Sequence, residues 1–196
     1  MQKLRKSKTK KHAGEKLKEA EKGQKKGFKI ALVGQTLTST SQEAFTLYDK
    51  SRLGQVMNGK VNFSFIEALY LCEKNKASVY EGKKRISFNS LLEKAKKYDD
   101  NLWPKFAVFR DLRNRGYIIK TALKFGADFR VYEKGIKPGQ DHAKWIVFPV
   151  HENSKLTWHE FSAKNRVAHS TKKNLLIAIV DEEGDVTYYE VSWLRP

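Results

Sequence analysis

The segment PKFAVFRDLRNRG, residues 104–116, precedes three short apolar runs: YIIKT at 117–121, FRVYE at 129–133 and WIVFPV at 145–150. Proline is favoured in the first turn of a helix and glycine just after its end. The segment therefore predicts a helix that starts at Pro104 and stops before Gly116. The three runs are rich in β-branched and aromatic residues, so each predicts a strand.

The rest of the C-terminal half continues this mixture of elements. Thr157 and Glu160 have the spacing of a capping box, which predicts a helix that starts at Thr157. Two apolar runs, 175–181 and 186–194, flank a glycine-containing turn and predict a hairpin. We therefore expect residues 103–196 to fold as a central sheet flanked by helices, an α+β arrangement.

Residues 28–102 predict a smaller α/β unit with no residue types or spacings that suggest a site. Its expected strands lie at 30–33, within 44–53 and at 77–80, and its expected helices follow two N-caps, Ser64 (with Glu67 completing a capping box) and Ser87. We interpret this unit as structural.

The chain is strongly basic. It has 196 residues with 39 Lys and Arg against 22 Asp and Glu, a formal charge of +17. A surplus of this size predicts a polyanionic partner, either nucleic acid or an acidic membrane surface. The sequence has no run of 18 apolar residues, which predicts no membrane-spanning helix. The single cysteine, Cys72, fits a reducing compartment, so we expect a cytoplasmic protein without membrane association.

Much of the charge lies at the N-terminus. Residues 1–27 contain 11 Lys or Arg and three Glu, which leaves +8 there and +9 for the rest of the chain. Because this stretch has almost nothing to bury, we expect a disordered tail. It could be a solubilising leader or a non-specific RNA-binding arm.

Three residues of the C-terminal half carry a possible acid–base chemistry. Tyr132 lies near the end of one expected strand, His142 follows ten residues later, and Lys173 precedes another strand. A base, an acid and a cation are what a metal-free ribonuclease needs. The plain alternatives are a packed tyrosine, a loop histidine and a solvated lysine. A tyrosine, with a pKa of about 10, needs a cationic setting to act near neutral pH, and Arg130 shares its strand face.

Several stretches resemble the archaeal tRNA-splicing endonucleases. The resemblance rests on FRDLRNRGY at 109–117, KTALKFGADFRVY at 120–132, FIEALYL at 65–71, RVAHS at 166–170 and the end of the chain from Val180 to Tyr189. It implies an N-terminal domain followed by a catalytic domain with a restriction-endonuclease-like fold and a central mixed sheet. It also implies Lys173 as the catalytic lysine, because the family's lysine stands just before the residue that precedes the strand. Lys172 is the fallback.

The resemblance implies a function as well. The chain would be the catalytic subunit of a tRNA-intron endonuclease that cuts precursor tRNA at bulge-helix-bulge junctions, without metal or cofactor. Tyr132 would take the proton of the 2′-hydroxyl, His142 would protonate the leaving 5′-oxygen, and Lys173 would stabilise the charge on phosphorus. The products would be 2′,3′-cyclic phosphate and 5′-hydroxyl ends.

The resemblance also suggests an RNA-binding pair. Arg166 and Trp193 match the positions where family members grip a bulged base between two flat groups. Their plain alternatives are an arginine on an exposed helix face and a tryptophan in a core strand.

Oligomerisation is implied by the same family, as a homotetramer or as a heterotetramer with a structural subunit. The acidic turn of Asp181, Glu182, Glu183 and Asp185 would dock into a basic groove of another subunit, unless it is a solvated hairpin turn. The final strand, 186–194, would form a two-fold contact, since an unpaired edge is prone to association.

Two rival interpretations remain open. A metal-dependent nuclease would need paired carboxylates with a following lysine, and only Asp128, Asp141 and Lys144 can be forced into that pattern. A non-catalytic RNA-binding subunit of the same complex is the second alternative, although such subunits typically lack the three site residues.

Overall fold

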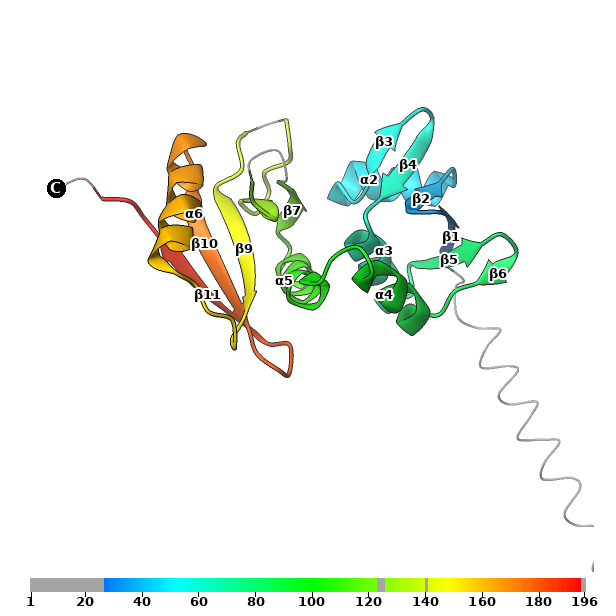
Figure 1. Ribbon diagram of the computed structural model, residues 1–196. Helices are drawn as coiled ribbons and strands as arrows, with labels where there is room; N and C mark the ends of the chain where they lie inside the picture. The colour runs from blue at the N-terminus through cyan, green and yellow to red at the C-terminus, as the bar shows by residue number, and fades with distance from the viewer. Residues whose placement is uncertain (1–26, 123–125, 140, 195–196) are drawn as a thin grey trace, which may run out of the picture.

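The computed structural model describes residues 27–122, 126–139 and 141–194. Its elements form two units that meet at one helix (Figure 1). In chain order they are β1 (Phe28–Val33), β2 (Thr36–Ser39), α2 (Gln42–Ser51), β3 (Gln55–Met57), β4 (Lys60–Phe63), α3 (Phe65–Glu73), β5 (Ala77–Glu81), β6 (Lys84–Arg85), α4 (Phe88–Lys96), α5 (Leu102–Asn114), β7 (Ile118–Thr121), β8 (Phe129–Tyr132), β9 (Trp145–His151), α6 (Trp158–Ser170), β10 (Asn174–Val180) and β11 (Val186–Val191). The predicted basic tail lies outside the described residues, apart from Gly27.

The N-terminal unit is a six-stranded mixed sheet in the order β3-β4-β2-β1-β5-β6, in which β1 and β5 run parallel. Both predicted caps are present. Ser64 Oγ accepts from the backbone N of Glu67 at 3.2 Å, and the Glu67 carboxylate accepts from the backbone N of Ser64 at 3.0 Å. Ser87 Oγ accepts from the backbone N of Ser90 at 3.2 Å and caps α4. The helices predicted after these two serines are therefore confirmed.

The strand expected between Ala44 and Leu53 is wrong, because this stretch forms the helix α2. Ser41 caps it, with its Oγ accepting from the backbone N of Ala44 at 3.2 Å. Ala44 and Tyr48, four residues apart, both pack against the core, which is the spacing of one helix face. The helix ends where Arg52 takes a left-handed conformation, at φ 55°.

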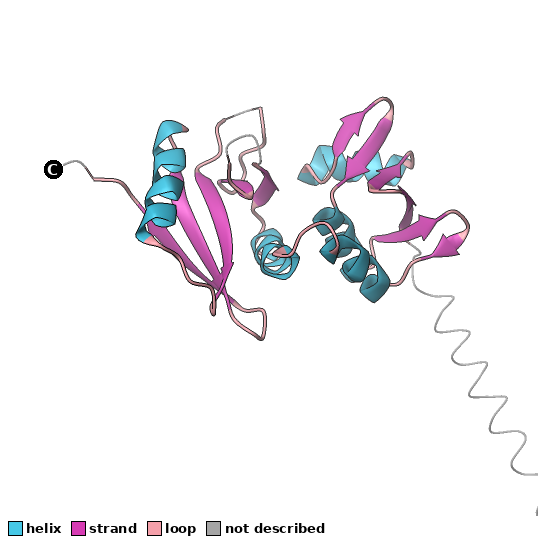
Figure 2. Cartoon of the chain, viewed as in Figure 1, coloured by secondary structure: helices cyan, strands magenta, loops and turns pink. Residues whose placement is uncertain are grey.

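The C-terminal unit is a five-stranded mixed sheet in the order β11-β10-β9-β8-β7, with β9 and β10 parallel and the other pairs antiparallel. Helices α5 and α6 lie on its two faces (Figures 1 and 2). Along β10, Leu176 and Ala178 belong to the core that contains α5, whereas Leu175 belongs to the core that contains α6. The predicted α+β fold, with a central mixed sheet between helices, is confirmed.

Helix α5 joins the two units through its aromatic side chains. The Phe109 ring lies 5.7 Å from the ring of Tyr70 in α3 and 6.1 Å from that of Phe129 in β8, measured between centroids. The Phe106 ring lies 5.9 Å from that of Phe88 in α4. One hydrophobic core therefore runs from the N-terminal unit through α5 into the C-terminal sheet. Among the helices of residues 27–122, 126–139 and 141–194, none is long and apolar enough to cross a lipid bilayer.

A buried polar cluster ties the same two units together. Glu67 is 8% exposed, and its Oε1 accepts from the backbone N of Gly54 at 2.9 Å. Lys120 of β7 donates to the carbonyl oxygen of Gly54 at 2.6 Å and lies 3.5 Å from Glu67 Oε1. Arg113 of α5 donates to the carbonyl oxygen of Ser51 at 2.7 Å, and burial lowers the pKa of Arg113 to about 10. The loop after α2 is thus fixed to α3, α5 and β7.

Replacing Glu67 with Gln should lower the free energy of unfolding by about 2–3 kcal/mol, because a side-chain NH₂ would then face a backbone N–H donor at Gly54 or Ser64. Urea denaturation measures the change. The control is Glu93→Gln, which removes an exposed ion pair to Lys96 and should cost less than about 1 kcal/mol. Equal, small losses in both variants would mean that the buried cluster does not hold the units together.

Candidate active site

One row of paired residues crosses the C-terminal sheet and sets the position of the site. Val131 of β8 pairs with Trp145 of β9, and Trp145 pairs with Asn174 of β10. Tyr132 comes directly after Val131, and Lys173 comes directly before Asn174. Because β8 runs antiparallel to β9 and β10 runs parallel to it, both residues extend beyond the row at the same end of the sheet.

A pocket of about 400 Å³ lies at this end of the sheet, and all three predicted catalytic residues line it, together with Arg130 and Asp141. Tyr132 comes from the end of β8, His142 from the loop that leads into β9, and Lys173 from the turn between α6 and β10. Three segments that are distant in sequence thus meet in one pocket.

Tyr132 is the most enclosed of the three, with 4% of its surface exposed. Arg130 lies two residues earlier on the same face of β8, and its guanidinium carbon is 5.9 Å from the centroid of the Tyr132 ring. Lys134, the other cation near Tyr132 in the sequence, lies instead over the ring of Tyr117, at 5.1 Å. The cationic neighbour of the tyrosine is therefore Arg130.

His142 is exposed, so a substrate can reach its ring. Its backbone N donates to Asp141 Oδ1 at 2.6 Å. Gly139 in the same loop has φ +94°, a left-handed conformation that favours glycine. The turn at Gly139 brings the chain back so that His142 lines the pocket with Tyr132.

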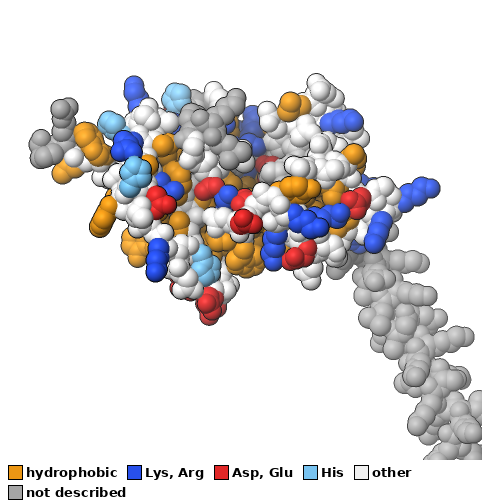
Figure 3. Space-filling model, viewed as in Figure 1, with side chains coloured by type: hydrophobic (Ala, Val, Ile, Leu, Met, Phe, Trp, Pro, Cys, Tyr) orange, Lys and Arg blue, Asp and Glu red, His pale blue; other side chains and the backbone are white. Residues whose placement is uncertain are grey.

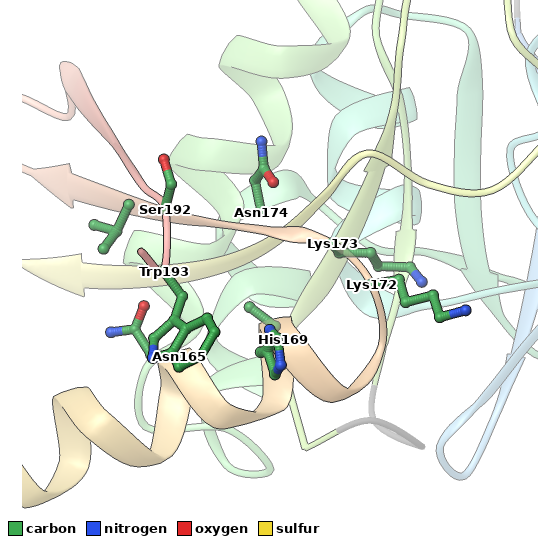
Figure 4. Close-up of a pocket in the computed structure, with 9 residues that line it drawn as sticks. Asn165, His169, Lys172, Lys173, Asn174, Ser192 and Trp193 are labelled. Carbon is green, nitrogen blue, oxygen red and sulfur yellow. The ribbon is translucent and has the colours of Figure 1, made fainter. Parts of the chain in front are cut away.

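Lys173 is half-buried and Lys172 is exposed. Lys173 Nζ donates to the carbonyl oxygen of Thr171 at 2.7 Å, and burial together with the charge of Arg130 holds the pKa of Lys173 below its usual value. Lys172 has φ 54° and lines a neighbouring pocket, which it shares with Lys173 (Figure 4). Of the two lysines, only Lys173 lines the pocket that contains Tyr132 and His142.

The residues of the predicted RNA-binding pair, Arg166 and Trp193, line a separate pocket of about 610 Å³. Trp193 lies beyond the end of β11, which stops at Val191, so the strand expected to continue to 194 is shorter than predicted. The Trp193 ring is 58% exposed, and its centroid is 4.6 Å from that of His169 in α6 (Figure 4). Sequence reasoning missed His169, because no local motif marks a contact that the fold alone creates.

The acidic turn lies at the opposite end of β10 and β11 from the pocket. Glu182, Glu183 and Asp185 are exposed, and none of them forms an ion pair with another residue that the structure describes. Asp181 is half-buried, and its Oδ1 accepts from the backbone N of Asp185 at 2.8 Å. Arg110 Nη2 of α5 donates to the carbonyl oxygen of Gly184 at 3.3 Å and fixes the turn to the body of the unit.

Basic side chains are spread over the surface. On the face drawn in Figure 3, Lys and Arg occur over both units with Asp and Glu among them. Within the described parts of the chain, no three side chains of His, Cys, Asp or Glu gather closely enough to hold a metal ion.

Comparisons with known proteins cover most of the chain. Residues 29–92 match the N-terminal domain of the tRNA intron endonucleases, and residues 102–188 match their catalytic C-terminal domain. The chain is 41% identical over 172 residues to the tRNA-splicing endonuclease of Thermococcus onnurineus. These residues make up 87% of this chain and 99% of that protein. It is 42% identical over 164 residues to the tRNA-splicing endonuclease of Methanothermobacter thermautotrophicus, which covers 82% of this chain and 93% of that protein.

Proposed function

The chain belongs to the tRNA intron endonuclease family, and we propose that it is a catalytic subunit that cleaves precursor tRNA at intron junctions. The observation that carries this proposal is the pocket at the end of the C-terminal sheet, which Tyr132, His142 and Lys173 line together. A base, an acid and a cation around one cavity can bring about a transesterification at phosphorus without a metal ion.

In the proposed reaction, Tyr132 takes the proton of a ribose 2′-hydroxyl, and the 2′-oxygen attacks the adjacent phosphorus. The bond from phosphorus to the 5′-oxygen breaks, and His142 gives that oxygen its proton. Lys173 stabilises the negative charge of the pentacovalent intermediate. The products are a 2′,3′-cyclic phosphate and a 5′-hydroxyl. Because the nucleophile is the 2′-hydroxyl, the reaction is specific for RNA.

The surroundings of each residue suit its proposed role. The Arg130 guanidinium carbon lies 5.9 Å from the centroid of the Tyr132 ring, so a cation adjoins the proposed base. The exposed His142 can meet a leaving group that enters from solvent. Lys173, directly before β10, contributes a cation to the same pocket.

We propose a bulge-helix-bulge as the RNA structure that is recognised. Sequence readout is poor in an A-form helix, so splayed bases and overall shape would carry specificity. Arg166 and Trp193 line one pocket, and the exposed indole could stack on a bulged base, a contact worth about 1–3 kcal/mol. His169 packs against Trp193 and would hold the indole in place.

Two cuts per intron call for two sites at a fixed separation, so we propose that the chain works as an oligomer. β11 is an edge strand, and Tyr189 on it is 56% exposed, which suits a two-fold contact with another subunit. The exposed carboxylates of the acidic turn would dock into a basic groove of a further subunit. The assembly would be a homotetramer or a heterotetramer with a structural subunit.

Replacing His142 with Ala should lower the single-turnover cleavage rate by about 10²–10⁴-fold in excess chelator, because the leaving oxygen loses its proton donor. Gel analysis of labelled precursor tRNA measures the rate. The control is His151→Ala, at the other end of β9, which should leave the rate nearly unchanged. An unchanged rate in the His142 variant would favour the alternative, a non-catalytic RNA-binding subunit.

Reversing Glu182, Glu183 and Asp185 to lysine should leave folded dimers that cleave poorly, because the turn would repel a basic groove. Sedimentation at physiological salt measures the assembly. A control that reverses Asp49, Glu81 and Glu93, three exposed acids of the N-terminal unit, has the same net charge and should remain tetrameric. Tetramers that survive reversal of the turn would refute the docking role, even allowing for screening of surface pairs.

A further inference from the structure

Arg130 is a second cation at the proposed catalytic pocket beside Lys173, and the proposed reaction gives it no direct contact with the substrate. It lies on β8, two residues before Tyr132, so both side chains project from the same face of the strand. It lines the pocket that contains Tyr132, His142 and Lys173. It also lines an adjoining pocket of about 440 Å³ that Lys120 and Thr121 share. The guanidinium therefore lies between two cavities.

The Arg130 guanidinium has no acidic partner in the described parts of the chain. No hydrogen bond or ion pair joins it to another described residue, and its Nε is buried without a hydrogen-bond partner. Its guanidinium carbon lies over the face of the Tyr132 ring. Two lysines feel the charge of Arg130. Burial and the positive charge of Arg130 both lower the pKa values of Lys173 and Lys120. Arg130 is half-buried, and a cation that lies among other cations is stabilised when an anion binds beside it.

The backbone around Arg130 is rigid, so this unfavourable arrangement cannot relax easily. Arg130 pairs with Lys120 of β7 on one side and with Ile146 of β9 on the other, so β8 is held on both edges at this residue. Neighbouring side chains on β8, Phe129 and Val131, are buried in the core. The backbone that carries the guanidinium is thus held in position before any ligand binds, which favours electrostatic stabilisation of a reaction.

We propose that Arg130 binds a non-bridging oxygen of the scissile phosphate, as a second cation of the pocket beside Lys173. This inference rests on the function proposed above. The attack of the 2′-oxygen adds charge to the non-bridging oxygens of the phosphorus, and one lysine contributes a single point charge. A guanidinium presents a planar fork of N–H donors that matches two oxygens of a phosphate. Arg130 and Lys173 together therefore hold the phosphate between Tyr132 and His142.

A purely structural role for Arg130 is the rival explanation. In that case the guanidinium would only support the ring of Tyr132, and a phosphate would touch Lys173 alone. The two roles differ in what happens to catalysis and to binding. A contact that strengthens in the transition state lowers the rate when it is removed but leaves ground-state affinity almost unchanged.

The test compares Arg130→Gln and Arg130→Lys with Lys134→Gln, which removes one charge from the chain just after β8, outside the pocket. In single-turnover cleavage of precursor tRNA, the rate of the Arg130→Gln variant should be about 10²–10³-fold lower than that of the unchanged protein. Arg130→Lys should recover about a tenth of the full rate, since it restores the charge but not the fork. Lys134→Gln should remain near the full rate.

Two further readouts follow the ground-state affinity and the charge that Arg130 adds to the pocket. The affinity for a precursor tRNA with a 2′-deoxyribose at each cleavage position should change by less than about threefold in Arg130→Gln, because ground-state binding is spread over many contacts. NMR titration of the lysines should show the pKa of Lys173 rising in Arg130→Gln, because a neighbouring positive charge is gone. Thermal unfolding of each variant checks that the fold is intact.

The outcomes distinguish this inference from the proposed function. If His142→Ala is inactive while Arg130→Gln cleaves like Lys134→Gln, the phosphate contact is refuted and the proposed function stands. If both variants cleave normally, the proposed function fails as well. A loss in Arg130→Gln that Arg130→Lys does not reduce, or that matches an equal loss of affinity, would also overturn the contact. If the Arg130→Gln variant does not fold, the Arg130→Lys variant still tests the proposal. A full cleavage rate in Arg130→Lys would show that the paired N–H donors of the guanidinium do not bind the phosphate.

Discussion

The pairing of Val131 with Trp145 and of Trp145 with Asn174 is the constraint on which the rest of the site depends. Side chains alternate between the faces of a strand, so a slip of one residue in either pairing would move Tyr132 or Lys173 to the opposite face of the sheet. The apolar residues of β9 and β10 prevent such a slip, because Val147 and Leu176 fill one core and Ile146 and Leu175 fill the other. The geometry of the pocket is thus set by burial on both faces of the sheet.

The N-terminal unit supports this register from outside the sheet. Phe109 of α5 contacts Tyr70 on one side and Phe129 of β8 on the other, so the strand that carries Tyr132 packs against a helix shared by both units. The buried Glu67 and Lys120 continue the connection into β7, the neighbour of β8. Lys120 pairs across the sheet with Arg130, and the polar cluster therefore lies directly beside the pocket.

Local signals in the sequence predicted much of the fold, because caps and turns depend on neighbouring residues. The capping boxes at Ser64 and Thr157 start helices where expected. The three apolar runs after α5 form the strands β7, β8 and β9. The strand predicted between Ala44 and Leu53 is wrong, because the cap at Ser41 and the four-residue spacing from Ala44 to Tyr48 favour a helix. The contact of Trp193 with His169 and the position of Arg130 between two pockets depend on tertiary packing, so no local pattern could predict them.

In the proposed reaction, side chains of this chain alone perform a transesterification at the 2′-hydroxyl. The most direct test is to identify the ends of the RNA fragments that the purified protein releases from precursor tRNA in excess chelator, by mass spectrometry. The account predicts 2′,3′-cyclic phosphate and 5′-hydroxyl ends, and no cleavage where the ribose before the junction lacks its 2′-hydroxyl. Fragments with 3′-hydroxyl and 5′-phosphate ends, or cleavage that returns only when magnesium is added, would contradict it.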